Sequence, residues 1–127
     1  MPTVPARVAE FTARHLRTID DLQVLIACME GEGRWWGMDS TARHLGITRA
    51  IAARSLDHLA RQNLFDIRVS NDIGYRFAPG TRQLKEDALA VLTEYRRNPL
   101  DVVRLLTDSR GVRDFADAFR IKRHDDR

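Results

Sequence analysis

Cysteine, lysine and long apolar runs are all scarce in this 127-residue chain. The single cysteine, Cys28, excludes an internal disulfide and a cysteine-rich metal site, and it favours a reducing compartment. The longest uninterrupted apolar run, residues 24–29, is far shorter than the ~20 residues that a membrane-spanning helix needs. The N-terminal residues also lack the apolar core of a secretory signal. We therefore expect a cytoplasmic protein with no membrane partner.

Signatures of catalysis are missing as well. The sequence has no nucleophile elbow, no phosphate-binding loop and no paired catalytic carboxylates. No spacing among the four histidines resembles a zinc site. We expect no enzymatic activity, no metal ion and no other cofactor.

Charge is distributed unevenly along the chain. The formal net charge is +3, and nearly all of the cations are arginine. Residues 40–62 contain four arginines and a single acidic residue, so this stretch has a local excess equal to the whole net charge. A local cluster of cations indicates a polyanionic partner better than a small net charge does.

Hydrophobic periodicity predicts helices before this basic stretch and within it. A short helix is expected over residues 7–16, and a longer one begins at Thr18, with Asp21 three residues later as in a capping box. Asp39 or Ser40 then offers an N-cap for a brief third helix.

A tight turn and a hairpin follow. Gly46 ends the brief helix, and Thr48 caps a helix that continues to about residue 62. Apolar and polar residues alternate over 65–70, and after a turn rich in Asn, Asp and Gly the alternation resumes, which is typical of a β-hairpin. Asn63, just before the hairpin, is expected to tolerate a left-handed conformation.

The last third of the chain is expected to be helical. Thr81 is the predicted N-cap of a helix that continues to about residue 97, and Pro99 occupies the first position of another helix, with Val103 and Leu106 facing inward. Ser109 is expected to cap a final helix that carries Val112, Phe115, Ala116 and Phe119.

Two segments resemble a known class of protein. Residues 40–49, S-T-A-R-H-L-G-I-T-R, resemble the A-x-x-L-G-I-[ST]-x signature of bacterial helix-turn-helix regulators. Residues 56–65, L-D-H-L-A-R-Q-N-L-F, resemble the run between recognition helix and wing in MarR- and ArsR-like proteins. The resemblance covers about residues 20–78, although the turn of the wing carries no cation. It implies a mainly α fold with a small β-hairpin wing (α+β), a winged helix-turn-helix with additional C-terminal helices.

The resemblance also implies a function. We expect a sequence-specific regulator of bacterial transcription that binds double-stranded DNA and reads the major groove with the helix around residues 48–62. Arg49 and Arg54 would bond guanine edges, and Arg68 and Arg76 would lie against phosphates or the minor groove. The expected DNA-binding residues are Ser40, Arg43, Thr48, Arg49, Ala50, Ala53, Arg54, Asp57, Arg68 and Arg76.

The C-terminal third is expected to mediate association. Residues 1–80 would form the DNA-binding domain, and residues 81–127 a helical extension for dimerisation or docking. A homodimer would match two recognition helices to half-sites about 34 Å apart. The expected dimer-interface residues are Phe11, Leu92, Tyr95, Val103, Leu106, Phe115 and Phe119.

Alternatives stay open at this stage. A winged helix can instead serve as a protein-interaction module that docks on transcription or other nucleoprotein machinery, with a protein partner held by the C-terminal helices. Trp35 and Trp36 could stack on an aromatic ligand, but one Trp in the core and the other under the wing or at a dimer contact is favoured. Cys28 is expected to be a buried, inert thiol.

Overall fold

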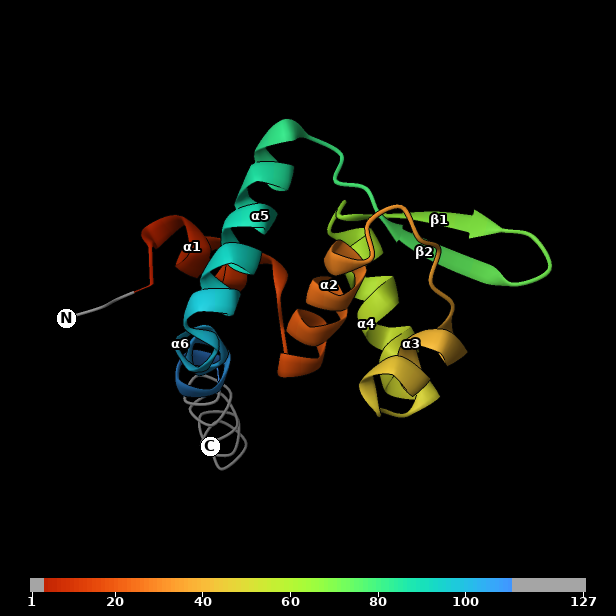
Figure 1. The fold of residues 1–127 in the computed structure, drawn as a ribbon, viewed down its shortest axis with the longest axis horizontal. Helices are drawn as coiled ribbons and strands as arrows, with labels where there is room; N and C mark the ends of the chain where they lie inside the picture. Colours follow the sequence, from red (N-terminus) through yellow and green to blue (C-terminus); the bar gives the residue numbers. More distant parts are fainter. Residues whose placement is uncertain (1–3, 111–127) are drawn as a thin grey trace, which may run out of the picture.

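The computed structural model describes residues 4–110, and over this range the chain is helical apart from one β-hairpin (Figure 1). This confirms a mainly α fold with a β-hairpin wing. None of the described helices is long and apolar enough to cross a membrane. In chain order the elements are α1 (Ala6–His15), α2 (Ile19–Glu30), α3 (Met38–Leu45), α4 (Arg49–Arg61), β1 (Phe65–Val69), β2 (Ile73–Phe77), α5 (Arg82–Arg97), α6 (Pro99–Arg104) and the π-helical turn η1 (Leu105–Arg110).

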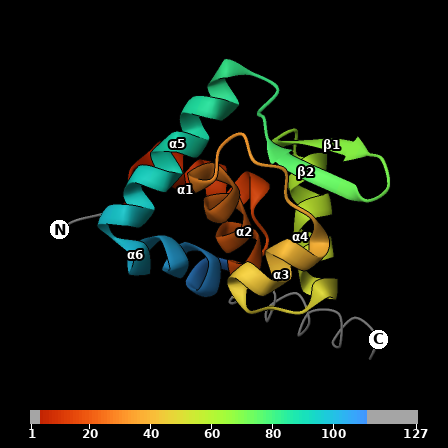
Figure 2. The ribbon, with the colours of Figure 1, turned by 45° about the vertical axis from the view of Figure 1, so that its right-hand side comes forward.

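Helix α2 lies in the middle of the molecule. Helices α3 and α4 and the hairpin lie on one side of it, and α1, α5 and α6 lie on the other (Figures 1 and 2). Every residue of α2 from position 24 to position 29 is buried, as expected of a helix that is apolar all round.

One hydrophobic core joins the two sides. It contains Val8 of α1, Leu56 of α4 and Val91 of α5. Because this core includes residues from both sides of positions 80/81, the division predicted there is not a boundary in the packing. Helices α5 and α6 belong to the same packed unit as the winged helix-turn-helix.

Three helices begin at the predicted N-caps. The side chains of Thr18, Thr48 and Thr81 each accept a hydrogen bond, at 3.1 Å, from the backbone N–H three residues later. Each bond satisfies one of the backbone donors that a helix N-terminus leaves without an intrahelical partner.

The start of α3 differs from the prediction, whereas its end does not. The N-cap is Gly37, neither Asp39 nor Ser40. Ser40 lies one turn into the helix, and its Oγ accepts from the backbone N of Gly37 at 2.9 Å. Gly46 ends α3 with a φ of 70°, and Asn63, before the hairpin, has a φ of 66°; both left-handed conformations were predicted.

The hairpin is antiparallel, with Phe65 opposite Phe77 at its base and Val69 opposite Ile73 at its tip. Trp36 forms an isolated bridge with β2, in which its backbone N and O each bond Tyr75 at 2.7 Å. This bridge fixes the α2–α3 connection against the hairpin.

The C-terminal end of the described range corrects one prediction, the N-cap at Ser109, whereas Leu106 and Val103 do face the core, Leu106 buried and Val103 half-buried. Helix α6 begins at Pro99, as expected, but it continues directly into η1, so Ser109 does not start a new helix. The fully buried residue of α6 is Val102, while Val103 is only half-buried. The last predicted helix lies beyond residue 110, outside the described residues.

Candidate nucleic-acid interface

Helix α4 buries one face and exposes the other. Ala52, Ser55, Leu56 and Leu59 are buried. The remaining face carries the positions predicted to reach DNA. Of these, Arg49, Ala50 and Arg54 are exposed, and Ala53 and Asp57 are half-buried.

Ion pairs neutralise part of this face. Arg49 Nε donates to Asp39 Oδ1 at 2.8 Å, which joins the start of α4 to the first turn of α3. Asp57 pairs with Arg61 one turn further along α4, at 2.9 Å. Arg49 is therefore restrained and partly neutralised, although its side chain is exposed.

Three exposed arginines around the helix-turn-helix have no ion-pair partner among residues 4–107, whose side chains the structure describes: Arg43 on α3, Arg54 on α4 and Arg68 on β1. The backbone carbonyl of Arg54 accepts a bond from the Arg17 guanidinium at 3.4 Å. Its own guanidinium is left to solvent. On this side of the molecule, these three side chains carry the unpaired positive charge that an anionic partner could meet.

Trp35 lies under one face of the hairpin. The guanidinium carbons of Arg68 and Arg76 are each 4.4 Å from the centroid of its ring. Gly74 leaves room for the indole, since an added Cβ would lie 3.4 Å from Trp35 Cε3. Arg76 also pairs with Asp66 at 3.3 Å. Two of the predicted phosphate contacts, Arg68 and Arg76, are thus held against an aromatic ring. The adjacent Trp36 is buried in the core, so one Trp lies in the core and the other under the wing, as the favoured alternative predicted.

The opposite face of the hairpin is apolar and uncovered towards its tip. Ile67, Val69 and Ile73 are 49%, 76% and 40% exposed. All three lie on the side of the sheet that buries Phe65 and Tyr75 at its base. The sequence analysis did not identify this exposed strip.

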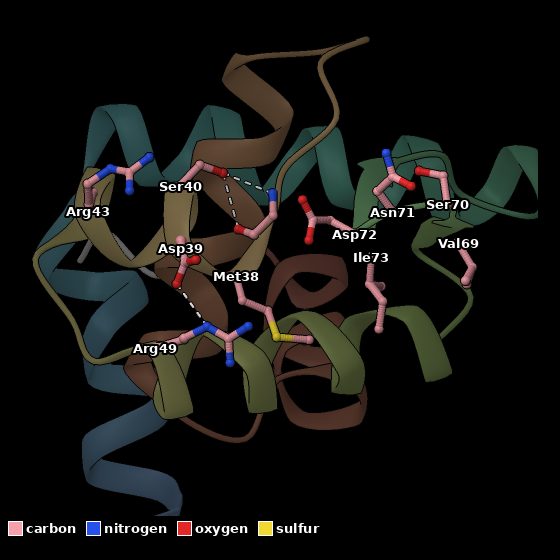
Figure 3. Close-up of a pocket in the computed structure, with 11 residues that line it drawn as sticks. Met38, Asp39, Ser40, Arg43, Arg49, Val69, Ser70, Asn71, Asp72 and Ile73 are labelled. Carbon is pink, nitrogen blue, oxygen red and sulfur yellow. Dashed lines mark hydrogen bonds and ion pairs between the residues drawn. The ribbon is translucent and has the colours of Figure 1, made fainter.

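A groove separates the hairpin tip from the helix-turn-helix. It has a volume of about 540 Å³ and is lined by residues 37–40, Arg43, Arg49 and residues 69–73. Figure 3 shows the ion pair of Asp39 with Arg49 on one side of the groove and the hairpin tip on the other. Cations, hydroxyls and apolar side chains therefore border the same open space.

Two predicted DNA-binding hydroxyls have structural roles. Ser40 Oγ accepts from the backbone N of Gly37 and donates to its carbonyl at 3.2 Å, so both functions of this hydroxyl serve the start of α3. Thr48 Oγ accepts from the backbone N of Ile51 at the start of α4. Ser40 is half-buried, whereas Thr48 is exposed.

A buried carboxylate lies behind α4. Asp21 of α2 is fully buried, and its oxygens accept from Ser55 Oγ at 2.7 Å, from the backbone N of Arg17 at 2.9 Å and from Arg17 Nε at 3.0 Å. Burial by itself raises the pKa of this carboxyl, but the hydrogen bonds from Arg17 and Ser55 outweigh that effect and lower the pKa below its ordinary value. The sequence analysis assigned Asp21 only to a capping box, because its partner Ser55 is distant in the chain.

The predicted dimer-interface residues are mostly used within one chain. Phe11, Leu92 and Leu106 are buried in the core of the single chain, which leaves little of their surface to contact a second copy. Tyr95 and Val103 are half-buried against the same core. Phe115 and Phe119 lie outside the described residues.

The described residues show no cluster suited to metal binding. No group of three or more His, Cys, Asp or Glu side chains within residues 4–107 is arranged to hold a metal ion. Cys28 is buried, and burial raises the pKa of its thiol to about 12. A thiol in this state is protonated at neutral pH and is a poor nucleophile.

Comparison with known proteins gives structural likenesses alone. No protein-family model and no curated protein matches the chain. The crystal structure of the ST1889 protein from the thermoacidophilic archaeon Sulfolobus tokodaii is similar, with 17% identity and a TM-score of 0.50, over 69% of this chain and 94% of that one. The crystal structure of RV1404 from Mycobacterium tuberculosis is similar with 18% identity and a TM-score of 0.51, over 89% of this chain and 82% of that one. At these identities the likeness shows the fold and nothing more.

Proposed function

We propose that this protein is a sequence-specific regulator of transcription that binds double-stranded DNA, with α4 as its recognition helix. The observation that carries the proposal is the exposed face of α4, which presents Arg49 and Arg54 from a helix that is otherwise fixed in the core. A recognition helix needs such a face, because side chains near its N-terminal half reach base edges in the major groove.

The unpaired cations support the proposal. Arg43 and Arg54 lie on the two helices of the motif and have no acidic partner within the described range. Arginine donors match the O6 and N7 acceptors of guanine, and a cation on the preceding helix is placed to meet the phosphate backbone. In this assignment Arg54 reads a base and Arg43 binds a phosphate.

The hairpin would contact DNA through the cations of its strands, since its tip, residues 70–72, carries none. Arg68 and Arg76 are held against Trp35, on the face of the hairpin opposite to its exposed apolar strip. These two arginines therefore serve as phosphate contacts at the side of the complex, and they carry no sequence information.

Selection from a random duplex library tests the proposal. We expect the wild-type protein to enrich a preferred sequence. Arg54→Ala should lower affinity for that sequence by about 1–3 kcal/mol and relax the preference at one base position, because one bidentate contact is lost. The binding constants of the preferred and random duplexes are the measurement.

A matched variant controls for charge. Arg97, at the end of α5, is also exposed and has no ion-pair partner among the described residues, but α5 lies on the other side of α2 (Figure 1). Arg97→Ala should keep the preference of the wild type. Equal losses on preferred and random duplexes in Arg54→Ala would rule out base reading by Arg54.

A protein-interaction module is the second candidate, because the hairpin exposes Ile67, Val69 and Ile73 on one face. An uncovered apolar strip is typical of a surface that binds another protein. If this candidate is correct, the chain should fail to bind any duplex at low salt. Val69→Ser should then weaken capture of a protein partner without destabilising the fold.

A further inference from the structure

Several polar contacts hold the inner face of α4 against the end of α1, the α1–α2 connection and the first turn of α2. Ser55 Oγ donates to Asp21, and His58 Nε2 donates to the backbone carbonyl of His15 at 2.7 Å. In the reverse direction, the Arg17 guanidinium donates to the backbone carbonyl of Arg54 at 3.4 Å. Helix α4 is thus held at Arg54, Ser55 and His58, along one side, by groups between the end of α1 and the first turn of α2.

Asp21 is the centre of these contacts. Its Oδ2 accepts hydrogen bonds from the backbone N and from Nε of Arg17. Its Oδ1 accepts from Ser55 Oγ and, at 3.3 Å, from Nη2 of Arg17. His58 Nε2 also lies near this carboxylate, 3.9 Å from Oδ2. The carboxylate therefore joins α4 and the α1–α2 connection through a single buried group.

We propose that Asp21 is a positioning residue for DNA reading: through Ser55 and Arg17 it fixes the placement of α4, and hence the direction in which Arg54 leaves the helix. The inference rests on the proposed function, since it concerns the accuracy of base reading. It assigns a role in recognition to a residue that is fully buried and so has no surface of its own to offer to DNA.

The physical basis is the directionality of hydrogen bonds. Apolar contacts, such as those of Leu56 and Leu59 with the core, are non-directional and permit small rotations of a helix. The short hydrogen bond from Ser55 to a buried carboxylate permits far less rotation of α4, because a hydrogen bond weakens steeply when its geometry changes. Ser55 directly follows Arg54, so any rotation of α4 that breaks this bond also displaces the Arg54 side chain.

The test compares two charge-matched variants. Asp21→Asn keeps the shape of the side chain but replaces one acceptor oxygen with a donor. Asp20→Asn removes the same charge from the neighbouring residue, whose carboxylate makes no hydrogen bond or ion pair recorded among the described residues. The readout is the ratio of affinities for a duplex selected by the wild type and for a random duplex, each measured by fluorescence anisotropy.

A loss of stability alone lowers both affinities by the same factor and leaves the ratio unchanged. We expect Asp21→Asn to lower the ratio of selected to random affinity about fivefold or more, as for the loss of one base contact. Asp20→Asn should have the same ratio as the wild type. A wild-type ratio in Asp21→Asn would overturn the inference while leaving the proposed function intact. If the wild type itself selects no sequence, the proposed function fails and the inference fails with it.

Ser55→Ala keeps the test decisive if Asp21→Asn does not fold. This variant loses one hydrogen bond while the Asp21–Arg17 pair stays in place. We expect a folded protein, checked by circular dichroism, with a reduced ratio. An unchanged ratio in folded Ser55→Ala would contradict the role of Asp21 in positioning α4.

Discussion

Asp21 and Cys28 are both buried in α2, and their pKa values move in opposite directions. Burial disfavours the charged form of each group. The carboxyl of Asp21 nonetheless has a lowered pKa because Arg17 and Ser55 donate to it, whereas the thiol of Cys28 has no such donor and its pKa is raised to about 12. Burial alone therefore does not decide the charge of a side chain in this core; its partners do.

The lowered pKa of Asp21 makes part of the stability dependent on pH. A group whose pKa is lower in the folded than in the unfolded protein stabilises the fold at pH values above the unfolded pKa, here 3.8. This contribution disappears as the pH falls through the pKa of the folded protein. We expect the destabilisation caused by Asp21→Asn to be largest near neutral pH and to shrink as the pH falls below about 4. Urea unfolding of both proteins across a pH series measures this difference. A difference that does not change with pH would contradict the assigned hydrogen bonds.

Local roles of residues could be predicted, whereas distant partners could not. Thr48 and Gly46 were predicted correctly, because a cap or a left-handed turn depends on a few neighbouring residues. The pairs Arg49–Asp39 and Asp21–Ser55 form between residues that lie far apart in sequence. No local pattern indicates them, so Arg49 was expected to bond a guanine edge, and its pairing with Asp39 was not predicted.

The helix-turn-helix depends on the start of α4. The Oγ of Thr48 accepts from the backbone N of Ile51, which satisfies one donor of a helix whose first turn contains no acidic residue. Because this end of α4 carries Arg49 and faces the groove, its stability bears directly on the proposed interface.

Removal of this cap should therefore be costly. We expect Thr48→Ala to lower the free energy of unfolding by about 1 kcal/mol, because one helix donor loses its partner. Thr48→Ser, which keeps the hydroxyl, should lower it far less. Chemical denaturation followed by circular dichroism measures both. Equal stabilities of the Ala variant and the wild type would show that Thr48 does not act as a cap in solution.

The hairpin shows what periodicity predicts and what it omits. Alternation over residues 65–70 predicted the strands correctly. Alternation does not indicate how far a sheet extends beyond the core. In β1, Phe65 is the one apolar residue that is buried. The exposed strip at Ile67 and Val69 follows from the reach of the hairpin past α4, which is a property of the tertiary fold.

Across the whole molecule, the C-terminal helices complete the core. Helix α5 packs against α1, and Arg7 on α1 pairs with Asp87 on α5 at 2.9 Å. The sequence indicated that α5 and α6 each have an apolar face to bury. It could not indicate the packing partner, because an apolar helix face fits a second chain and a neighbouring helix of the same chain equally well. The homodimer stays a prediction, and it would use other surfaces than Phe11, Leu92 and Leu106, which are buried within the chain.

A core substitution distinguishes these two roles. We expect Leu92→Ala to lower the free energy of unfolding by about 2–5 kcal/mol, because a buried leucine leaves a cavity. The loss should be independent of protein concentration, since the contacts lie within one chain. Thermal unfolding at several concentrations measures it, with Leu89→Ala, on the exposed face of α5, as the control. A loss that grows on dilution would instead place Leu92 at an interface between copies.

The salt dependence of binding to a random duplex tests the central claim most directly. If Arg43, Arg68 and Arg76 each contact a phosphate, the logarithm of the binding constant should fall with the logarithm of salt concentration with a slope of about −2.7 per chain, because about 0.9 counterions are released per phosphate contact. Fluorescence anisotropy over a series of salt concentrations gives this slope. A steep negative slope supports a DNA-binding surface on α3, α4 and the hairpin. The absence of binding at low salt, or affinity that does not change with salt, would contradict it.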